Sequence, residues 1–290
     1  MGIPGTDSGF NIRQVLTGCC LLLASTLATA EQVVYSFGVV PQYESRVLFS
    51  IWQPVLQELE RRTGLKFRLV GSPKIPVFEQ SFIAGEFDFA YTNPFHLYLA
   101  EGYQDYIPLI RDGSRMLQGI VVVKKDSPYK KLADLQNKTI AFPSVNALGA
   151  SLAVRATFSD AGLTAYKPLY VQTHSSVYLH VATGLTDAGG GVLSTLQAQP
   201  TALQQDMRII QTATGIPTHP VAAHPRVPVE HRERVQKAFL AMAKTAQGKK
   251  LLDRIPMYKP VRTDMRTYKV ISAMGFEKYY IKPARKQGDR

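Results

Sequence analysis

The stretch from Thr173 to Val192, THSSVYLHVATGLTDAGGGV, decides the fold. Strand-like residues 169–171 lead into it, and Gly184 stands where a helix would end. Between these points apolar side chains recur at helical spacing: Val177, Tyr178, Val181, Ala182 and Leu185. Asp187 and three glycines follow, where the backbone can approach another group closely. The order of strand, polar turn, short helix and glycine-rich return predicts a βαβ corner that faces a ligand.

The beginning of this helix is rich in polar groups. His174, Ser175 and Ser176 stand there, where free N–H groups and the helix dipole favour an anion. His174 would donate a hydrogen bond, or a charge, to an oxyanion. The alternative is that His174 only bonds the backbone at the helix start.

An earlier stretch repeats the second half of this pattern. Residues 85–90, GEFDFA, and 184–189, GLTDAG, share the form G-x-x-D-x-small. In both, a helix is expected to end at the glycine and a strand to begin near the aspartate, so Asp88 and Asp187 are expected to be structural. Two such units indicate two similar α/β lobes.

The first thirty residues have the features of a signal peptide. Arg13 supplies the positive charge, residues 15–27 the apolar core, and residues 28–30 a small-residue cleavage site. We therefore expect export to the periplasm and a soluble product. A lipid anchor at Cys19 is the less favoured alternative, because most of the apolar run follows that cysteine.

Composition excludes several classes of protein. After cleavage the chain would have no cysteine, hence no disulfide and no thiolate nucleophile. The net charge of +12 favours anionic partners, but the basic residues are scattered and no nucleic-acid motif is present. No catalytic motif and no histidine spacing typical of a metal site occurs. We expect no enzyme activity, no cofactor, no metal and no nucleic-acid partner.

Strands and helices alternate along the chain, which predicts a largely parallel sheet. A helix is expected over residues 46–63, kinked or broken at Pro54, with an apolar face that includes Val47. The lobes are expected to be interleaved, with crossovers near Gly119 and Pro217. The expected parts are residues 1–30 as signal peptide, 31–118 as the first part of lobe 1, 119–217 as lobe 2, and 218–290 as the return to lobe 1.

Four loops are expected at the carboxyl ends of strands, where open α/β sheets bind ligands: residues 41–45, 91–94, 143–149 and 173–176. Their neutral hydrogen-bonding groups suit anion binding better than bond breaking. The candidate ligand-binding residues are Tyr91, Thr92, Asn93, Ser144, Asn146, His174, Ser175 and Ser176. The alternatives are a core position for Tyr91, a helix start for Asn93, and helix capping for Ser144 and Asn146.

The motifs together resemble a known family. Residues 37–41 (FGVVP), 85–94 (GEFDFAYTNP), 123–128 (VKKDSP), 173–176 (THSS) and 187–189 (DAG) are similar to the phosphate/phosphite/phosphonate-binding proteins of ABC transporters. The resemblance covers nearly all of residues 33–280. It implies a type II periplasmic binding protein fold, in which two α/β lobes close on a ligand in the cleft between them.

The resemblance also implies which residues hold the ligand's oxygens: Tyr91 or Thr92, residues 144–148, and His174. The chain departs from the family pattern at residues 146–148, near residues 74–75, and at Thr218 or His219, where an acidic residue would be expected. Carboxylates that would meet an ammonium group are therefore missing. We expect a preference for phosphate, phosphite or a small alkyl phosphonate over an aminoalkyl phosphonate.

The expected role is a monomeric periplasmic protein that delivers a small phosphorus oxyanion to the permease of an ABC importer. The alternative is a ligand sensor that acts on a membrane histidine kinase. The sequence does not separate these two roles.

Overall fold

A computed structural model describes residues 1–5 and 33–282 of the chain. Residues 6–30 of the expected signal peptide, which include its apolar core, its cleavage site and Cys19, fall outside the described residues. Within the described ranges, no helix is both long enough and apolar enough to cross a membrane.

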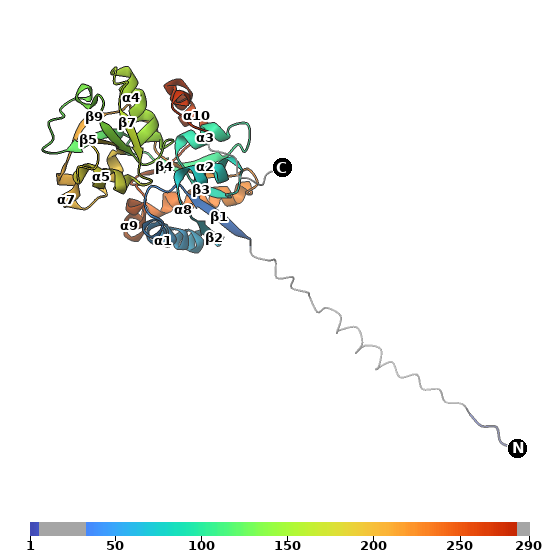
Figure 1. The fold of residues 1–290 in the computed structure, drawn as a ribbon. Coiled ribbons are helices and arrows are strands. Elements are labelled where there is room, and N and C mark those ends of the chain that lie inside the picture. The colour runs from blue at the N-terminus through green and yellow to red at the C-terminus, as the bar shows by residue number, and fades with distance from the viewer. Residues whose placement is uncertain (6–32, 283–290) are drawn as a thin grey trace. The chain divides into compact units, whose positions relative to one another are not determined.

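The strands form two sheets (Figure 1). Their bounds are β1 Val34–Val39, β2 Lys66–Val70, β3 Phe89–Tyr91, β4 Ile107–Asp112, β5 Gly119–Lys124, β6 Thr139–Phe142, β7 Lys167–Tyr170, β8 Ala188–Val192, β9 Met207–Thr212, β10 Pro220–Ala223 and β11 Pro260–Arg262. The first sheet has the order β11-β4-β10-β3-β1-β2 and the second the order β7-β6-β8-β5-β9. The prediction of a largely parallel sheet is wrong, because each sheet is mixed. Strands β1, β2 and β3 pair in parallel, as do β6, β7 and β8, whereas β10, β11, β5 and β9 pair antiparallel with their neighbours.

The helices lie between these strands in sequence. The α-helices are α1 Ser45–Thr63, α2 Ile75–Ile83, α3 Pro94–Ala100, α4 Val154–Asp160, α5 His174–Ala182, α6 Leu193–Gln197, α7 Thr201–Gln205, α8 Val229–Met242, α9 Ala246–Arg254 and α10 Met265–Tyr268. Short helical turns are η2 Leu132–Leu135, η3 Leu148–Ala153, η4 Lys269–Met274 and η5 Phe276–Lys278.

Strand β5 shows how the second sheet is buried on both faces. Its continuous apolar run is typical of a strand covered on both sides. Val121 and Val123 pack with α4 residues on one face, while Ile120 and Val122 pack with α5 residues on the other. Figure 1 shows α4 and α5 on opposite sides of these strands.

The deciding stretch folds as predicted at its start and differs at its end. Helix α5 begins at His174, and Gly184 follows it with a left-handed φ of 73°. Leu185 is exposed, contrary to the predicted stripe. The three glycines lie inside β8, and what approaches them closely is the protein's own core: Val177 at Gly189, Phe142 at Gly190 and Tyr178 at Gly191. The glycines are thus closely approached as expected, but by the protein's own core and not by a ligand.

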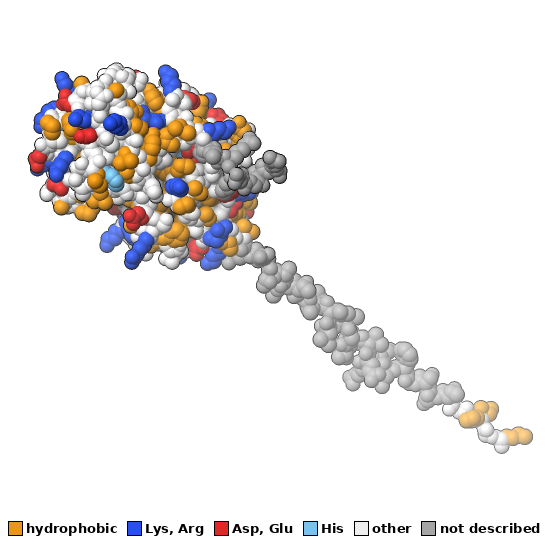
Figure 2. All heavy atoms as spheres, in the orientation of Figure 1, with side chains coloured by type: hydrophobic (Ala, Val, Ile, Leu, Met, Phe, Trp, Pro, Cys, Tyr) orange, Lys and Arg blue, Asp and Glu red, His pale blue; other side chains and the backbone are white. Residues whose placement is uncertain are grey.

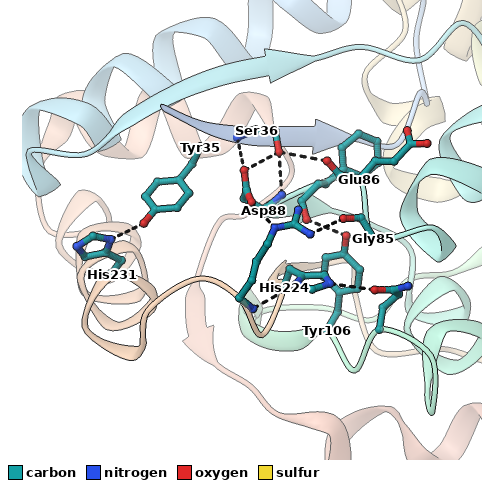
Figure 3. Close-up of polar contacts among 11 residues, drawn as sticks. Tyr35, Ser36, Gly85, Glu86, Asp88, Tyr106, His224 and His231 are labelled. Carbon is teal, nitrogen blue, oxygen red and sulfur yellow. Dashed lines mark hydrogen bonds and ion pairs between the residues drawn. The ribbon is translucent and has the colours of Figure 1, made fainter. Parts of the chain in front are cut away.

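The repeated G-x-x-D units perform the same structural task twice. Gly85 has a φ of 74°, close to that of Gly184, and β3 and β8 each begin directly after the aspartate. The Asp88 carboxylate accepts hydrogen bonds from the backbone N–H and hydroxyl of Ser36 on the parallel neighbour β1, both at 2.8 Å (Figure 3). Asp187 likewise accepts from the N–H of Thr139 on β6, at 2.9 Å. Both aspartates therefore fasten a strand's beginning to its neighbour.

Helix α1 differs from the expectation at two points. It is not broken at Pro54, and Val47, which was expected on the apolar face, is 43% exposed. Trp52, Val55 and Leu59 on its other side are buried in the first core, and this packing outweighs the hydrogen bond that a proline removes.

The chain crosses between the sheets twice, after β4 and after β9. The two crossing segments pair with each other: Leu117 N–H donates to the Ile216 carbonyl at 2.7 Å, and Ile216 N–H returns the bond at 3.0 Å. Residues far apart in sequence are thus joined at the point where the chain passes from one sheet to the other.

Candidate ligand-binding site

A small cavity lies between the two lobes, each of which is built around one of the sheets. From the first come Val40, Gln42, Ile75, Asn93 and His219, and from the second come Ala147, Leu148, Gly149, His174 and Val192. It encloses about 280 Å³ of atom-free space, open solvent at its mouth included. The centre of a water-sized sphere can reach only about 20 Å³ of that space, so the cavity leaves no room for an extended ligand.

His174 reaches this cavity because it is the first residue of α5. Its backbone N–H donates to the Gln42 carbonyl at 3.4 Å, which joins the two lobes. Its Nδ1 lies 3.4 Å from the Thr195 hydroxyl, and the side chain is buried. Burial lowers the pKa of His174 to about 4, so the imidazole is neutral near pH 7.

His219 is a second imidazole in the cavity, on the segment between β9 and β10. Its ring stacks on Tyr91, with centroids 5.4 Å apart. Burial and the nearby His174 lower the pKa of His219 to about 3. The sequence analysis noted Thr218 or His219 only as positions where the family has an acidic residue. His219 was therefore missed as a candidate ligand-binding residue. Gln42, in the loop after β1, was also missed.

Three candidates lie close together around β3 and α3. Asn93 lines the cavity and caps α3, with its side-chain oxygen 3.0 Å from the His96 N–H. Its amide donates to His96 Nε2 at 3.0 Å, which leaves Nδ1–H to donate to Thr92 at 2.9 Å. Thr92 is fully buried in this arrangement. Burial lowers the pKa of His96 to about 3, consistent with a neutral ring that both donates and accepts.

Tyr91 lies beside the cavity, between Trp52 and His219. It lines an adjoining hollow together with Tyr43, Gln42 and Arg254, and the two hollows share Val40 and Gln42. Burial raises the pKa of Tyr91, so its hydroxyl stays protonated and can donate.

Asn146 is placed differently from the other candidates. Its amide nitrogen donates to Glu79 of α2 at 3.1 Å and to the Ile281 carbonyl at 2.7 Å. Its side-chain oxygen accepts from the Ile281 N–H at 3.0 Å. Asn146 therefore ties its loop to α2 and to the C-terminal segment, and neither a cap nor a contact with the cavity is formed.

The remaining candidates lie next to the cavity residues rather than among them. Ser144 accepts through its carbonyl from the Ser151 hydroxyl at 2.5 Å. Ser176 bonds Thr173 at the start of α5, and Ser175 is half-buried. The loop after β6 contributes Ala147 to Gly149 instead.

Charge is sparse at the site and scattered elsewhere. No Lys, Arg, Asp or Glu lines the cavity. On the face in Figure 2, Lys and Arg lie dispersed, with Asp and Glu among them. The described residues contain no group of three or more His, Cys, Asp or Glu that could hold a metal ion.

Two comparisons of the sequence with known proteins point to the same family. A sequence model described as "ABC transporter, phosphonate, periplasmic substrate-binding protein" matches residues 37–268. The phosphonates-binding periplasmic protein of Escherichia coli strain K12 is 21% identical over 248 residues, which cover 81% of this chain and 73% of that protein.

Solved structures show the same fold. A binding protein component of an ABC phosphonate transporter from Pseudomonas aeruginosa has a TM-score of 0.75 at 18% identity, covering 84% of this chain and 86% of its own. PhnD1 from Prochlorococcus marinus, solved with methylphosphonate, has a TM-score of 0.78 at 16% identity, with 86% and 99% covered. The predicted type II periplasmic binding protein fold with two α/β lobes is confirmed.

Proposed function

Because this chain belongs to the family of periplasmic substrate-binding proteins of phosphonate ABC transporters, we propose that it captures a small phosphorus oxyanion in the cavity between its lobes and delivers it to an ABC importer. The observation that carries the proposal is the cavity itself, in which Asn93 and His219 of one lobe face His174 of the other. Imidazole and amide N–H groups in a buried site are suitable donors to phosphoryl oxygens.

The ligand we favour is a phosphonate with a small substituent, phosphite or phosphate. A ligand ammonium group needs a charged or hydrogen-bonding partner when it is buried. No carboxylate lines the cavity, so an aminoalkyl phosphonate would lack its counter-ion. The protein would then act as a carrier rather than an enzyme, since the lining residues include no nucleophile paired with a base.

The partners follow from the family. We propose a permease in the inner membrane as the partner of a monomeric binding protein, rather than a sensor kinase, because the matching family is described as part of a transporter. Export through removal of residues 1–30 remains a prediction. So does closure about the crossovers near Gly119 and Pro217, with the lobe bounds 31–118, 119–217 and 218–290.

Calorimetry with phosphate, phosphite, methylphosphonate and 2-aminoethylphosphonate tests the proposal. We expect one of the first three to bind most tightly. Tightest binding by the amino compound would contradict the assignment of ligand class, and no binding by any of the four would contradict the function.

His174→Ala tests the site. A hydrogen bond to a charged group contributes roughly 1.5–3 kcal/mol, so this variant should weaken binding by about ten- to a hundred-fold. His180→Ala is the matched control, because His180 lies on the same helix and its ring bonds the Ser176 carbonyl at 2.7 Å, away from the cavity residues. Equal affinities of the two folded variants would show that His174 does not contact the ligand.

A further inference from the structure

We infer that this site binds its oxyanion as a monoanion that carries a proton, with the neutral imidazoles of His174 and His219 as both donors and acceptors. The inference rests on the proposed function and narrows its ligand class to oxyanions that can be protonated. If the inference holds, the site should also reject sulfate, an anion of similar size that carries no proton at neutral pH.

The first observation is the balance of charge in the cavity. Ten residues line it, and only the two histidines among them can change charge within the usual pH range. A dianion buried among neutral groups has no counter-ion to compensate for the water it loses. A ligand bound as a monoanion carries half of the dianion's charge, so less charge is buried and the protein need not change its own.

The second observation is the state of the two imidazoles. His219 forms no hydrogen bond with the described residues, although only 8% of its surface is exposed. His174 has one contact on its ring, the long 3.4 Å approach of Thr195. A neutral imidazole has one N–H donor and one acceptor nitrogen. Each ring can therefore donate to a P–O⁻ oxygen or accept from a P–OH group.

The surrounding elements supply no acid that would protonate these rings, and the Arg254 cation lines the adjoining hollow rather than this cavity. Tyr91 of β3 stacks on His219, and Tyr178 of α5 donates to the Val192 carbonyl at 3.0 Å; burial raises the pKa of both hydroxyls. His96 of α3 is neutral, because burial and His219 lower its pKa. His174 and His219 also disfavour each other's charge.

Two acidic groups lie one layer away. The Glu79 carboxylate is 3.9 Å from His96 rather than from the cavity rings. Asp112 accepts through its side chain from Ser114 and the Lys259 N–H. Neither lines the cavity, so neither replaces the ligand as the source of negative charge.

A phosphonate or phosphite can satisfy this arrangement, because the second ionisation of phosphoryl groups lies near neutral pH. Its P–OH donates to an acceptor nitrogen while its oxygens accept from N–H groups. Sulfate can accept from the rings but has no proton to give, so no ring nitrogen would gain the hydrogen bond that a P–OH donates. A site built to pair a ligand proton rejects an analogue without one.

Calorimetry above the ligand's second pKa tests the inference. Methylphosphonate should be titrated into the mature protein at pH 8.5 in two buffers of different ionisation enthalpy. We expect uptake of about one proton per ligand, and an affinity that falls about tenfold for each pH unit above that pKa. Sulfate should bind at least about a hundredfold more weakly.

His219→Gln separates ligand protonation from protonation of His219, and the double variant His174→Gln/His219→Gln separates it from protonation of either ring. The glutamine amide is neutral and has both a donor and an acceptor, so affinity should fall by about tenfold while uptake stays near one proton. Loss of proton uptake in either variant would place the proton on an imidazole and overturn the inference.

Two other results would also overturn it: methylphosphonate binding without proton exchange, or sulfate binding within tenfold of methylphosphonate. In either case the proposed function would stand, because an oxyanion would still be bound. Absence of binding by every oxyanion would instead overturn the function as well.

Discussion

Replacing Glu79 by glutamine should change how the protein's stability depends on pH. Glu79 is fully buried on α2, where its carboxylate accepts from Asn146 and Tyr280. Burial raises its pKa from 4.5 to about 7, against the opposing effect of these two hydrogen bonds. A carboxyl whose pKa is higher in the folded state stabilises the fold below pH 4.5, and this stabilisation is lost as the pH rises through 7.

The magnitude follows from the shift. Between pH 5 and pH 7.5 the folded carboxyl passes from mostly protonated to mostly ionised, whereas the unfolded one is largely ionised at both. Each pKa unit corresponds to about 1.4 kcal/mol, which makes this pH-dependent part about 2 kcal/mol. Glutamine removes it, so Glu79→Gln should gain about 2 kcal/mol relative to the wild type on going from pH 5 to pH 7.5.

Urea unfolding of both proteins at pH 5 and pH 7.5 measures this quantity. Any constant effect of the substitution on hydrogen bonding appears equally at both pH values and cancels in the comparison, as do the titrations that both proteins share. A stability difference that is the same at both pH values would refute the assignment of a raised pKa to Glu79.

Other predictions concern stability and can be measured in the same way. Burial lowers the pKa values of His96, His174 and His219, so their contribution to stability is present above pH 6.5 and falls with acidification. Going from pH 7.5 to pH 5 should lower the free energy of unfolding by about 2 kcal/mol for each histidine. A free energy of unfolding that does not fall over this range would contradict the prediction. Asp187→Ala should cost about 1–3 kcal/mol, because it leaves the Tyr129 hydroxyl and the Thr139 N–H without their acceptor, and wild-type stability would contradict this. Gly190→Ala should cost at least about 3 kcal/mol, since its Cβ would overlap the Ala150 carbonyl, while Gly184→Ala meets open space and should cost only about 1–2 kcal/mol for its positive φ. Similar losses for the two glycine variants would show that overlap does not set the cost.

Local patterns predicted most of the fold because most elements are local. The alternation of strands and helices, the glycine ends of α2 and α5, and the start of α5 at His174 follow from spacing within a few residues. Strands β10 and β11 were missed. Each is short and contains proline, and each exists because it pairs with β4, more than a hundred residues earlier.

The candidate site divides in the same way. His174 and Asn93 lie in two of the loops expected at the ends of strands; each begins or caps a helix there, and each lines the cavity. Asn146 has the same local context, but its partners are Glu79, 67 residues away, and Ile281, 135 residues away. Patterns within a few residues cannot predict contacts between such distant positions. The stacking of His219 on Tyr91 could not be predicted for the same reason.

The interleaved strand order has a consequence for how the chain folds. Every strand of the second sheet comes from one continuous segment, residues 119–212, so that sheet can assemble as soon as this segment is available. The first sheet cannot assemble from the first part of the chain, because β10 stands between β3 and β4. Residues 34–112 alone would leave β4 separate from the sheet of β1, β2 and β3, with unpaired edges on both. The half that begins the chain should therefore be the last to be completed, and truncation before residue 223 should leave the second sheet intact and the first one open.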